Sequence, residues 1–438
     1  MTNNPKLEDE DAATKKDVAK KLSLEDLREA VSGNAAAFRC RRRLQPAGGE
    51  GDKVFPPTFA GAVYAVEQRR VRREESGPFE TATCVLLDSV PSQANRIELA
   101  LQEALDAGRI KIPVMEVDFT EHQPTGDVAA DKSNGRLIED VGKVTSLQVP
   151  HRLADAILRD SEFKGVAFRT SEKGKALNCA SPANATPIFA LCPTALVFGM
   201  WDSTGPKGGL GPKFERALVS EIVGVGAEVG DLLRGVRRDP LEIRAAVKVV
   251  KATDGSYSVA DPSSANGAIP PSGVNHSSVP FPKVRDRKTD DNLYSGVTID
   301  YAEQTTTLSL ICLRRLRFPV DGKTDPKADL VARTVLAALG LCGAALAFEG
   351  GVGLRSRCLL WPSEPMEWEL LARPGETPQK YSLTADEAVV LLKEAITSLD
   401  QTKLPWKTEP ITLEPSTELL NLVRLSQLVA IGEGPDAN

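Results

Sequence analysis

The pattern that most limits how this chain can fold is a strand–helix–strand succession in its first third. A short apolar run typical of a strand, residues 82–87, precedes residues 89–107, in which large apolar side chains recur every fourth position. Gly108 ends the periodic stretch, and a second strand-like run, residues 112–119, follows at once. A helix between two such strands packs on the sheet that they form. The expected fold class is therefore α+β.

The rest of the chain divides into further helices, strands and polar insertions. Helices are expected at residues 24–31 (with Ser23 as the cap), 151–159, 328–348, 385–400 and 416–429. Strands are expected at residues 62–66, 194–200 and 241–250, and at 298–301 and 305–316 as a hairpin. Residues 120–146 and 252–296 are polar and are expected to be long loops or insertions. The apolar run 335–348 is too short to cross a bilayer, which indicates a buried helix.

Composition points to an intracellular protein and leaves a nucleic-acid partner open. The first 22 residues are charged and lack the apolar segment of an export signal. Seven cysteines occur singly, without a CxxC pair, as suits a reducing cytoplasm. The net charge is −6, yet the middle of the chain is mildly basic. Because charge is screened within about 10 Å at cellular salt, a local basic groove can still hold a phosphate backbone.

A glycine- and lysine-rich loop is the most informative local feature. Residues 205–213 read GPKGGLGPK. A phosphate-binding Walker loop needs Gly-Lys-Ser/Thr at the start of a helix, but Pro212 separates glycine from lysine here and Phe214 replaces the hydroxyl. What remains is a cationic loop, rich in backbone N–H groups, beside the stacking ring of Trp201. These are the groups that bind phosphates and bases without sequence preference, although a simple surface turn has the same pattern.

Three other regions supply candidate phosphate contacts. The helix start at residues 89–96 offers free N–H groups and an arginine, and residues 39–43 and 68–73 are arginine runs. Capping and ordinary solvated charge are the alternative interpretations of these regions. The candidate nucleic-acid contacts are Arg41, Arg42, Arg43, Gln93, Asn95, Arg96, His151, Arg152, Trp201, Ser203, Thr204, Lys207, Lys213 and Arg216.

No constellation typical of catalysis is evident. The three histidines lie far apart and lack metal-ligand spacing, and no Gly-x-Ser-x-Gly motif occurs. Asp202 is the only acid beside the glycine-rich loop. We therefore expect no metal, no cofactor and no enzymatic activity. The alternative is an enzyme that cleaves RNA or uses a nucleotide, with Asp202 and the loop Gly205–Lys213 at its site.

Four segments, in order along the chain, resemble a known family. They read VLLDSVPSQANRIELAL at residues 85–101, PHRLADAILRDS at 150–161, ATPIFALCPTALVFGMWDSTG at 185–205 and GGLGPKFERALVSEIVG at 208–224. Together they resemble the RAMP-type backbone subunit (GSU family) of the type I-G, formerly I-U, CRISPR Cascade effector. The resemblance covers roughly residues 25–250.

The resemblance implies an architecture of three parts. Residues 1–22 are expected from their charged composition to be a flexible leader, and the resemblance makes residues 23–320 a modified RRM-like (ferredoxin-like) palm that binds RNA. Its insertions, at 120–146 and 252–296, would form a thumb and a helical subdomain. Residues 321–438 would be a strand-and-helix part packed on the palm. Since the short aromatic motif of a familiar RRM is absent, we expect binding by grooves and loops.

The resemblance also implies a role and partners. Such subunits are non-catalytic, polymerise along the CRISPR RNA in the cytoplasm, and present the guide to target DNA in antiviral defence. The implied partners are the CRISPR RNA, target DNA through the guide, further copies of the chain and other Cascade subunits, with no membrane. A structural interaction protein that binds no nucleic acid remains a further alternative.

Overall fold

A large sheet forms the centre of the protein. The computed structural model describes residues 19–60, 63–73, 77–229, 247–252, 256–261, 268–269 and 296–431. Within this part, ten strands form one sheet. Its order is β1 (Lys20–Lys21), β22 (Gln379–Ser382), β21 (Glu367–Leu371), β2 (Ala37–Pro46), β18 (Tyr301–Ser309), β13 (Leu218–Val225), β6 (Glu80–Asp88) and β5 (Val66–Val71), with the hairpin of β19 (Val352–Arg355) and β20 (Cys358–Pro362) attached to β2. The α+β class expected from the sequence is confirmed.

The middle of this sheet has a distinctive connectivity. Six of its main elements follow one another along the chain, with other elements between them. They are β2, the helix α2 (Val90–Asp106), β13, β18, the helix α9 (Pro326–Phe348) and β21. In space the four strands lie in the order β21-β2-β18-β13, and each is antiparallel to its neighbour. Strands adjacent in space are thus mostly distant in sequence, and α2 and α9 make the long connections between them.

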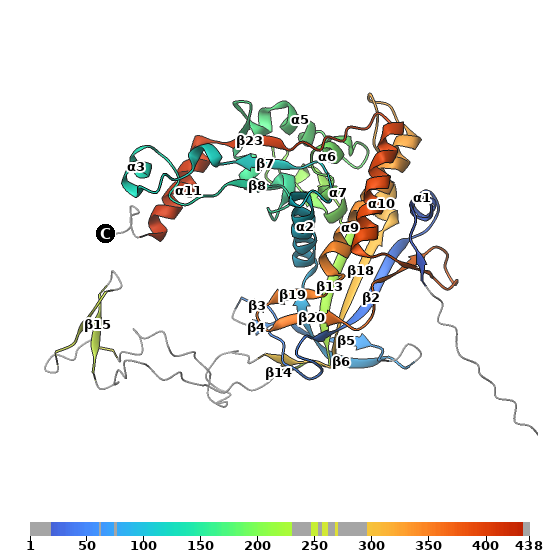
Figure 1. The fold of residues 1–438 in the computed structure, drawn as a ribbon, viewed down its shortest axis with the longest axis horizontal. Helices are drawn as coiled ribbons and strands as arrows, with labels where there is room; N and C mark the ends of the chain where they lie inside the picture. Colours follow the sequence, from blue (N-terminus) through green and yellow to red (C-terminus); the bar gives the residue numbers. More distant parts are fainter. Residues whose placement is uncertain are drawn as a thin grey trace, which may run out of the picture.

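Helix α9 is the core around which the other helices pack. It contacts α1 (Leu24–Ser32), α2 and α10 (Ala385–Thr397), which lie together beside the large sheet in Figure 1. Gly343 lets α2 approach closely, since a Cβ there would lie 2.6 Å from Ile97 Cγ2. Among the described residues, α9 is the one helix whose length and composition would allow a membrane span, but 78% of its apolar window is buried. This burial is typical of the core helix of a soluble protein, as expected for residues 335–348.

A second sheet forms a separate layer, at the top of Figure 1. Its order is β10 (Val166–Ala167), β9 (Ser161–Phe163), β23 (Ile411–Pro415), β7 (Met115–Asp118) and β8 (Lys143–Thr145). Residues 120–146 therefore hold ordered elements, namely η1 (Thr120–His122), α3 (Val128–Ser133) and β8, rather than one long loop. The C-terminal residues contribute β19–β22 to the large sheet, β23 to the small one, and end in α11 (Thr417–Ala430).

Two of the predicted strands are wrong. Residues 194–198 form the short helix α7, because Pro193 begins a helical turn and an all-apolar run has no period that separates strand from buried helix. Only Met200–Trp201 is a strand, β11. The run 305–316 is a strand only to Ser309, whose side chain caps the helix α8 (Leu310–Arg314).

The predicted hairpin near residue 300 is also wrong. Strand β17 (Val297–Thr298) pairs with β14 (Glu228–Val229), while β18 pairs with β2 and β13. The segment 151–159 is two short turns, η2 (Arg152–Ala154) and α4 (Ala156–Arg159), rather than one helix.

The long helices predicted from periodicity are confirmed, including α1 with its Ser23 cap and α2, α9, α10 and α11. Five of the seven cysteines are buried, as expected for cysteines that pack as small apolar residues.

Of the strand expected at 241–250, only the end is described, in β15 (Val249–Lys251), which pairs with β16 (Tyr257–Val259). Residues 1–18 of the leader, 241–246 and most of 252–296 lie outside the described residues. The remaining elements are β3 (Thr58–Phe59), β4 (Val63–Tyr64), η3 (Phe168–Thr170), α5 (Glu172–Asn178), α6 (Thr186–Leu191), η4 (Gly208–Leu210), β12 (Lys213–Phe214) and η6 (Ser398–Gln401).

Candidate nucleic-acid interface

The glycine-rich loop is carried by a small antiparallel hairpin. Strand β11 pairs with β12 so that Trp201 lies directly opposite Lys213. The Trp201 side chain is 52% exposed, and Lys213 Nζ lies 4.9 Å from the centroid of its ring. The hairpin thus presents an indole surface and a cation together at the protein surface, as stacking and phosphate contacts require.

The loop between these strands is folded around a buried ion pair. Asp202 is fully buried, and its two carboxylate oxygens accept hydrogen bonds from Arg169 Nη1 and Nη2 at 2.5 and 2.9 Å. Two glycines close over it, since a Cβ on Gly211 would lie 1.9 Å from the Asp202 carbonyl oxygen and one on Gly205 would lie 2.4 Å from the carboxylate. The only acid of the loop is therefore neutralised inside the protein.

The remaining polar groups of the loop face solvent. Lys207, Lys213 and Arg216 are exposed, and no ion pair of theirs occurs within the part of the chain that the structure describes. Ser203 and Thr204 are also exposed, and Arg159 Nη1 lies 3.4 Å from Thr204 Oγ1. We call Trp201, Ser203, Thr204, Lys207, Lys213 and Arg216 the loop surface. Among the described residues it carries three cations without an ion pair. The one exposed carboxylate within its span, Glu215, is paired with Arg315 at 2.7 Å.

A second buried arginine fixes the segment before Trp201. Arg152 Nε and Nη2 both donate to the Glu98 carboxylate at 2.6 Å, and Arg152 Nη1 donates to the Gly199 carbonyl at 3.0 Å. The Arg152 backbone is left-handed, with φ of 52°, which is strained for a residue with a side chain. Burial raises the pKa of Glu98 to about 7, and Arg152 opposes that rise. Through its bond to the Gly199 carbonyl, Arg152 therefore fixes the residue that precedes β11.

Three residues predicted as nucleic-acid contacts are buried: Arg42, Gln93 and Arg152. Alternation along β2 turns Arg42 toward the helices, where its Nε donates to Gln304 Oε1 at 2.8 Å and desolvation lowers its pKa. The Gln93 amide donates to Asp88 Oδ2 at 2.5 Å. With their polar atoms inside the protein, these side chains have no surface from which to reach a ligand in this conformation, and we assign them to the fold.

The other predicted residues are not part of the loop surface. Arg41 and Arg43 share the opposite, open face of β2, where Arg41 pairs with Glu303 at 2.8 Å and the Arg43 guanidinium lies 4.2 Å from the Tyr301 ring centroid. Arg96 pairs with Asp88 at 2.9 Å at the start of α2. Asn95 is partly exposed there. His151 is exposed beside η2, which packs against β11. The structure thus brings together the residues from Trp201 to Arg216, with His151 on a neighbouring element.

Sequence reasoning missed the residues that shape the loop. Arg169 is an isolated arginine 33 positions before Asp202, so no local pattern marked the pair. Leu210, 89% exposed at the loop, was also passed over because a single apolar residue carries no periodicity. Spacing within the loop predicted its exposed cations but not the buried anchors beneath it.

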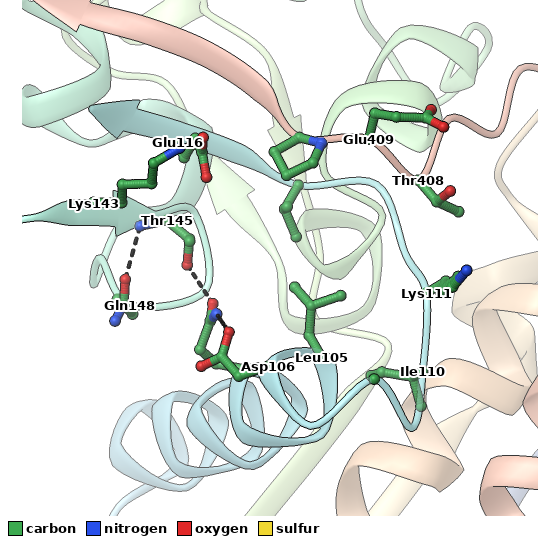
Figure 2. A pocket seen from close by; sticks show the side chains of 14 residues that line it. Leu105, Asp106, Ile110, Lys111, Glu116, Lys143, Thr145, Gln148, Thr408 and Glu409 are labelled. Carbon is green, nitrogen blue, oxygen red and sulfur yellow. Dashed lines mark hydrogen bonds and ion pairs between the residues drawn. The ribbon is translucent and has the colours of Figure 1, made fainter. Parts of the chain in front are cut away.

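A pocket of about 580 Å³ lies elsewhere, between the end of α2 and the second sheet (Figure 2). Its charges compensate one another: Lys143 Nζ lies 2.9 Å from Glu116 Oε1 and 3.1 Å from Asp118 Oδ2. Thr145 Oγ1 lies 2.5 Å from Gln102 Oε1 across its wall. The described residues contain no group of three or more His, Cys, Asp or Glu arranged to hold a metal ion. This pocket therefore differs from the loop surface, where positive charge dominates.

Part of the chain matches the model of a known protein family. The model of the family described as CRISPR-associated protein GSU0053 matches residues 38–229, somewhat under half of the chain. That segment extends from β2 to β14 and contains both buried arginine pairs and the whole loop surface. No curated protein matches the sequence significantly.

Proposed function

We propose that this CRISPR-associated protein of the GSU0053 type is a non-catalytic subunit that binds CRISPR RNA through its loop surface. In this proposal it is a RAMP-type backbone subunit of a type I-G Cascade, present in several copies along the guide in the cytoplasm. The assembled guide then pairs with target DNA, and other Cascade subunits complete the effector.

One observation carries the proposal. The loop surface exposes Trp201 and three cations that have no ion pair among the described residues, while the carboxylate of the same loop is withdrawn and held by Arg169. A single strand presents phosphates for the cations and a base face for the indole, whatever its sequence. A guide-binding subunit has this requirement, because it must accept any spacer.

The strand order of the large sheet supports the proposed RRM-like palm, which would then extend beyond residue 320 to include α9 and β21. The succession β2-α2-β13-β18-α9-β21, arranged as β21-β2-β18-β13, has the β-α-β-β-α-β order of the ferredoxin-like motif. Further strands are inserted between β2 and α2, between α2 and β13, between β13 and β18, and between α9 and β21. The thumb would be an addition to this palm. Residues 120–146 form part of the second sheet, and 252–296 lie largely outside the described residues.

The alternative is an RNA-cleaving or nucleotide-using enzyme with Asp202 and the loop Gly205–Lys213 at its site. A carboxylate that activates a nucleophile or binds a metal ion needs an oxygen within reach of the reacting atoms. Both oxygens of Asp202 are bonded to Arg169 and the side chain is fully buried. The geometry therefore favours a structural role for Asp202.

The test is co-purification of RNA with the protein expressed beside its CRISPR array and partner subunits. We expect wild type to retain RNA of discrete length, with affinity falling as salt rises. The triple variant Lys207→Ala, Lys213→Ala, Arg216→Ala should bind at least tenfold more weakly. Its salt slope should fall by about 2, because each phosphate that the protein neutralises contributes roughly 0.7 to the slope.

The matched control variant removes the same charge elsewhere, at the exposed Lys111, Lys393 and Lys407. If both triple variants bind alike, the loop surface is not the interface. If wild type carries no RNA, the proposed function is wrong. Magnesium-dependent RNA cleavage that Asp202→Asn abolishes, in a variant that still folds, would establish the enzyme instead.

A further inference from the structure

The hairpin of β9 and β10 has an unusual turn. Phe163 pairs with Val166, so Lys164 and Gly165 form a two-residue loop, with φ of 53° and 70°. A turn with two left-handed residues favours asparagine, aspartate or glycine at its first position. A lysine there is strained, and backbone strain of this kind is concentrated at functional sites, although the surrounding structure must hold it.

The strained lysine belongs to a cluster around one aromatic ring. Lys164 Nζ lies 5.2 Å from the centroid of the Phe163 ring, and Lys173 Nζ, from α5, lies 6.0 Å from it. Lys164 is exposed and has no ion pair within the described residues, while Lys173 is 3.4 Å from Glu172. Glu162 lies on the other face of its strand, because neighbouring strand residues point to opposite sides. The cluster thus repeats the pairing of Trp201 with Lys213.

The hairpin is joined to the loop surface at both of its ends. Arg159, two residues before β9, contacts Thr204, and Arg169, two residues after β10, binds Asp202. Thr204 and Asp202 both belong to the connection between β11 and β12. The two aromatic–lysine pairs are therefore carried by neighbouring segments whose relative position these contacts fix.

We propose that the β9–β10 hairpin is a second contact site for the same single-stranded RNA, with Lys164 and Lys173 binding phosphates and the edge or face of Phe163 meeting a base. The proposal rests on the proposed function. It extends the RNA path from the loop surface across the hairpin, and it requires no particular base sequence because the recognised groups are common to every nucleotide.

The variant Lys164→Gly removes the lysine side chain without disturbing the fold, so its effect on RNA binding can be measured separately from stability. Glycine accepts the left-handed backbone, so this variant should be at least as resistant to urea as wild type. It should nevertheless bind RNA several-fold more weakly at low salt, with a salt slope reduced by about 0.7. Phe163→Leu keeps an apolar side chain but removes the aromatic ring, and we expect binding to weaken by about fivefold or more. Lys111→Ala is the control and should change neither quantity.

The outcomes distinguish this proposal from the function on which it rests. If the loop-surface triple variant loses RNA while Lys164→Gly and Phe163→Leu bind as wild type does, the hairpin site is wrong and the function stands. If wild type binds no RNA, both are wrong. If the hairpin variants keep RNA but no longer co-purify with other subunits, the hairpin is a protein contact and the proposal is overturned.

Discussion

At the scale of single residues, the surroundings of an arginine decide what it does. Arg41 and Arg42 are neighbours on β2, yet one pairs with Glu303 on the open face and the other is buried under the helices. Arg152, which is buried, and Arg169, whose side chain is 11% exposed, lie beside the loop surface, and each is bonded to one carboxylate. Breaking such a pair leaves an uncompensated buried charge, so we expect these residues to influence the proposed RNA binding only through the shape of the loop.

Glu98 gives this arrangement a measurable pH dependence. Its pKa is about 7 in the folded chain, because burial disfavours the carboxylate, against an ordinary value of 4.5. Between these values the folded state holds a proton that the unfolded state has released, so stability falls as the pH rises through this window. Relative to Glu98→Gln, which does not titrate there, wild type should be more stable at about pH 5 than at about pH 8, by roughly 2 kcal/mol.

Urea unfolding of both proteins at the two pH values measures this difference. Comparing the two chains cancels the titration of all other groups. A stability difference that is the same at both pH values would mean that Glu98 remains ionised throughout, held by Arg152.

At the scale of elements, α2 and α9 can cross closely because residue 343 is a glycine and has no side chain. Glycine inside a helix is unfavourable by about 1 kcal/mol relative to alanine. At Gly343 an added Cβ would meet Ile97 at 2.6 Å and Leu101 at 3.2 Å. Gly343→Ala should therefore destabilise the protein by about 1–3 kcal/mol despite its better helix propensity.

Thermal or urea unfolding checks this, and the double variant with Ile97→Ala is the control. Removing the Ile97 branch makes room for the new methyl group, so the two changes together should cost less than the sum of each alone. If the two stability changes simply add, the methyl group added at Gly343 does not clash with Ile97, and the explanation by close helix packing is wrong.

At the scale of the whole molecule, the last strand among the described residues, β23, completes a sheet whose other strands come from far earlier in the sequence. Strand β23 lies parallel to β7 and antiparallel to β9, so it joins the two segments on either side of residues 120–160. Leu413, at its centre, is fully buried. The hairpin and the loop surface next to β9 therefore depend on residues near the C-terminus.

Leu413→Ala should cost about 2–5 kcal/mol of stability through the cavity that it leaves. Hydrogen exchange should accelerate at the amides of residues 115–117 and 161–163, far away in sequence but adjacent in the sheet. Val429→Ala, at an exposed position of α11, is the control and should change neither. Faster exchange confined to residues 411–415 would show that β23 is not needed by its neighbours.

Local patterns determined those parts of the fold that depend on neighbours in sequence. The periodic helices, the Ser23 cap and the exposed lysines of the glycine-rich loop were all predictable, because each needs residues only a few positions apart. The misassigned run 194–200 shows the limit of such patterns, since an all-apolar segment is compatible with either a buried helix or a buried strand.

Tertiary structure alone decided which charged residues are available to a partner. Arg152 meets Glu98 across 54 positions, and Arg169 meets Asp202 across 33, and no spacing rule relates residues so distant. Burial then removed Arg42, Gln93 and Arg152 from the surface, and folding placed Lys173 beside Phe163 on a hairpin adjoining the loop. The physical reason is that a charge is free or compensated according to what the folded chain brings within hydrogen-bond distance of it.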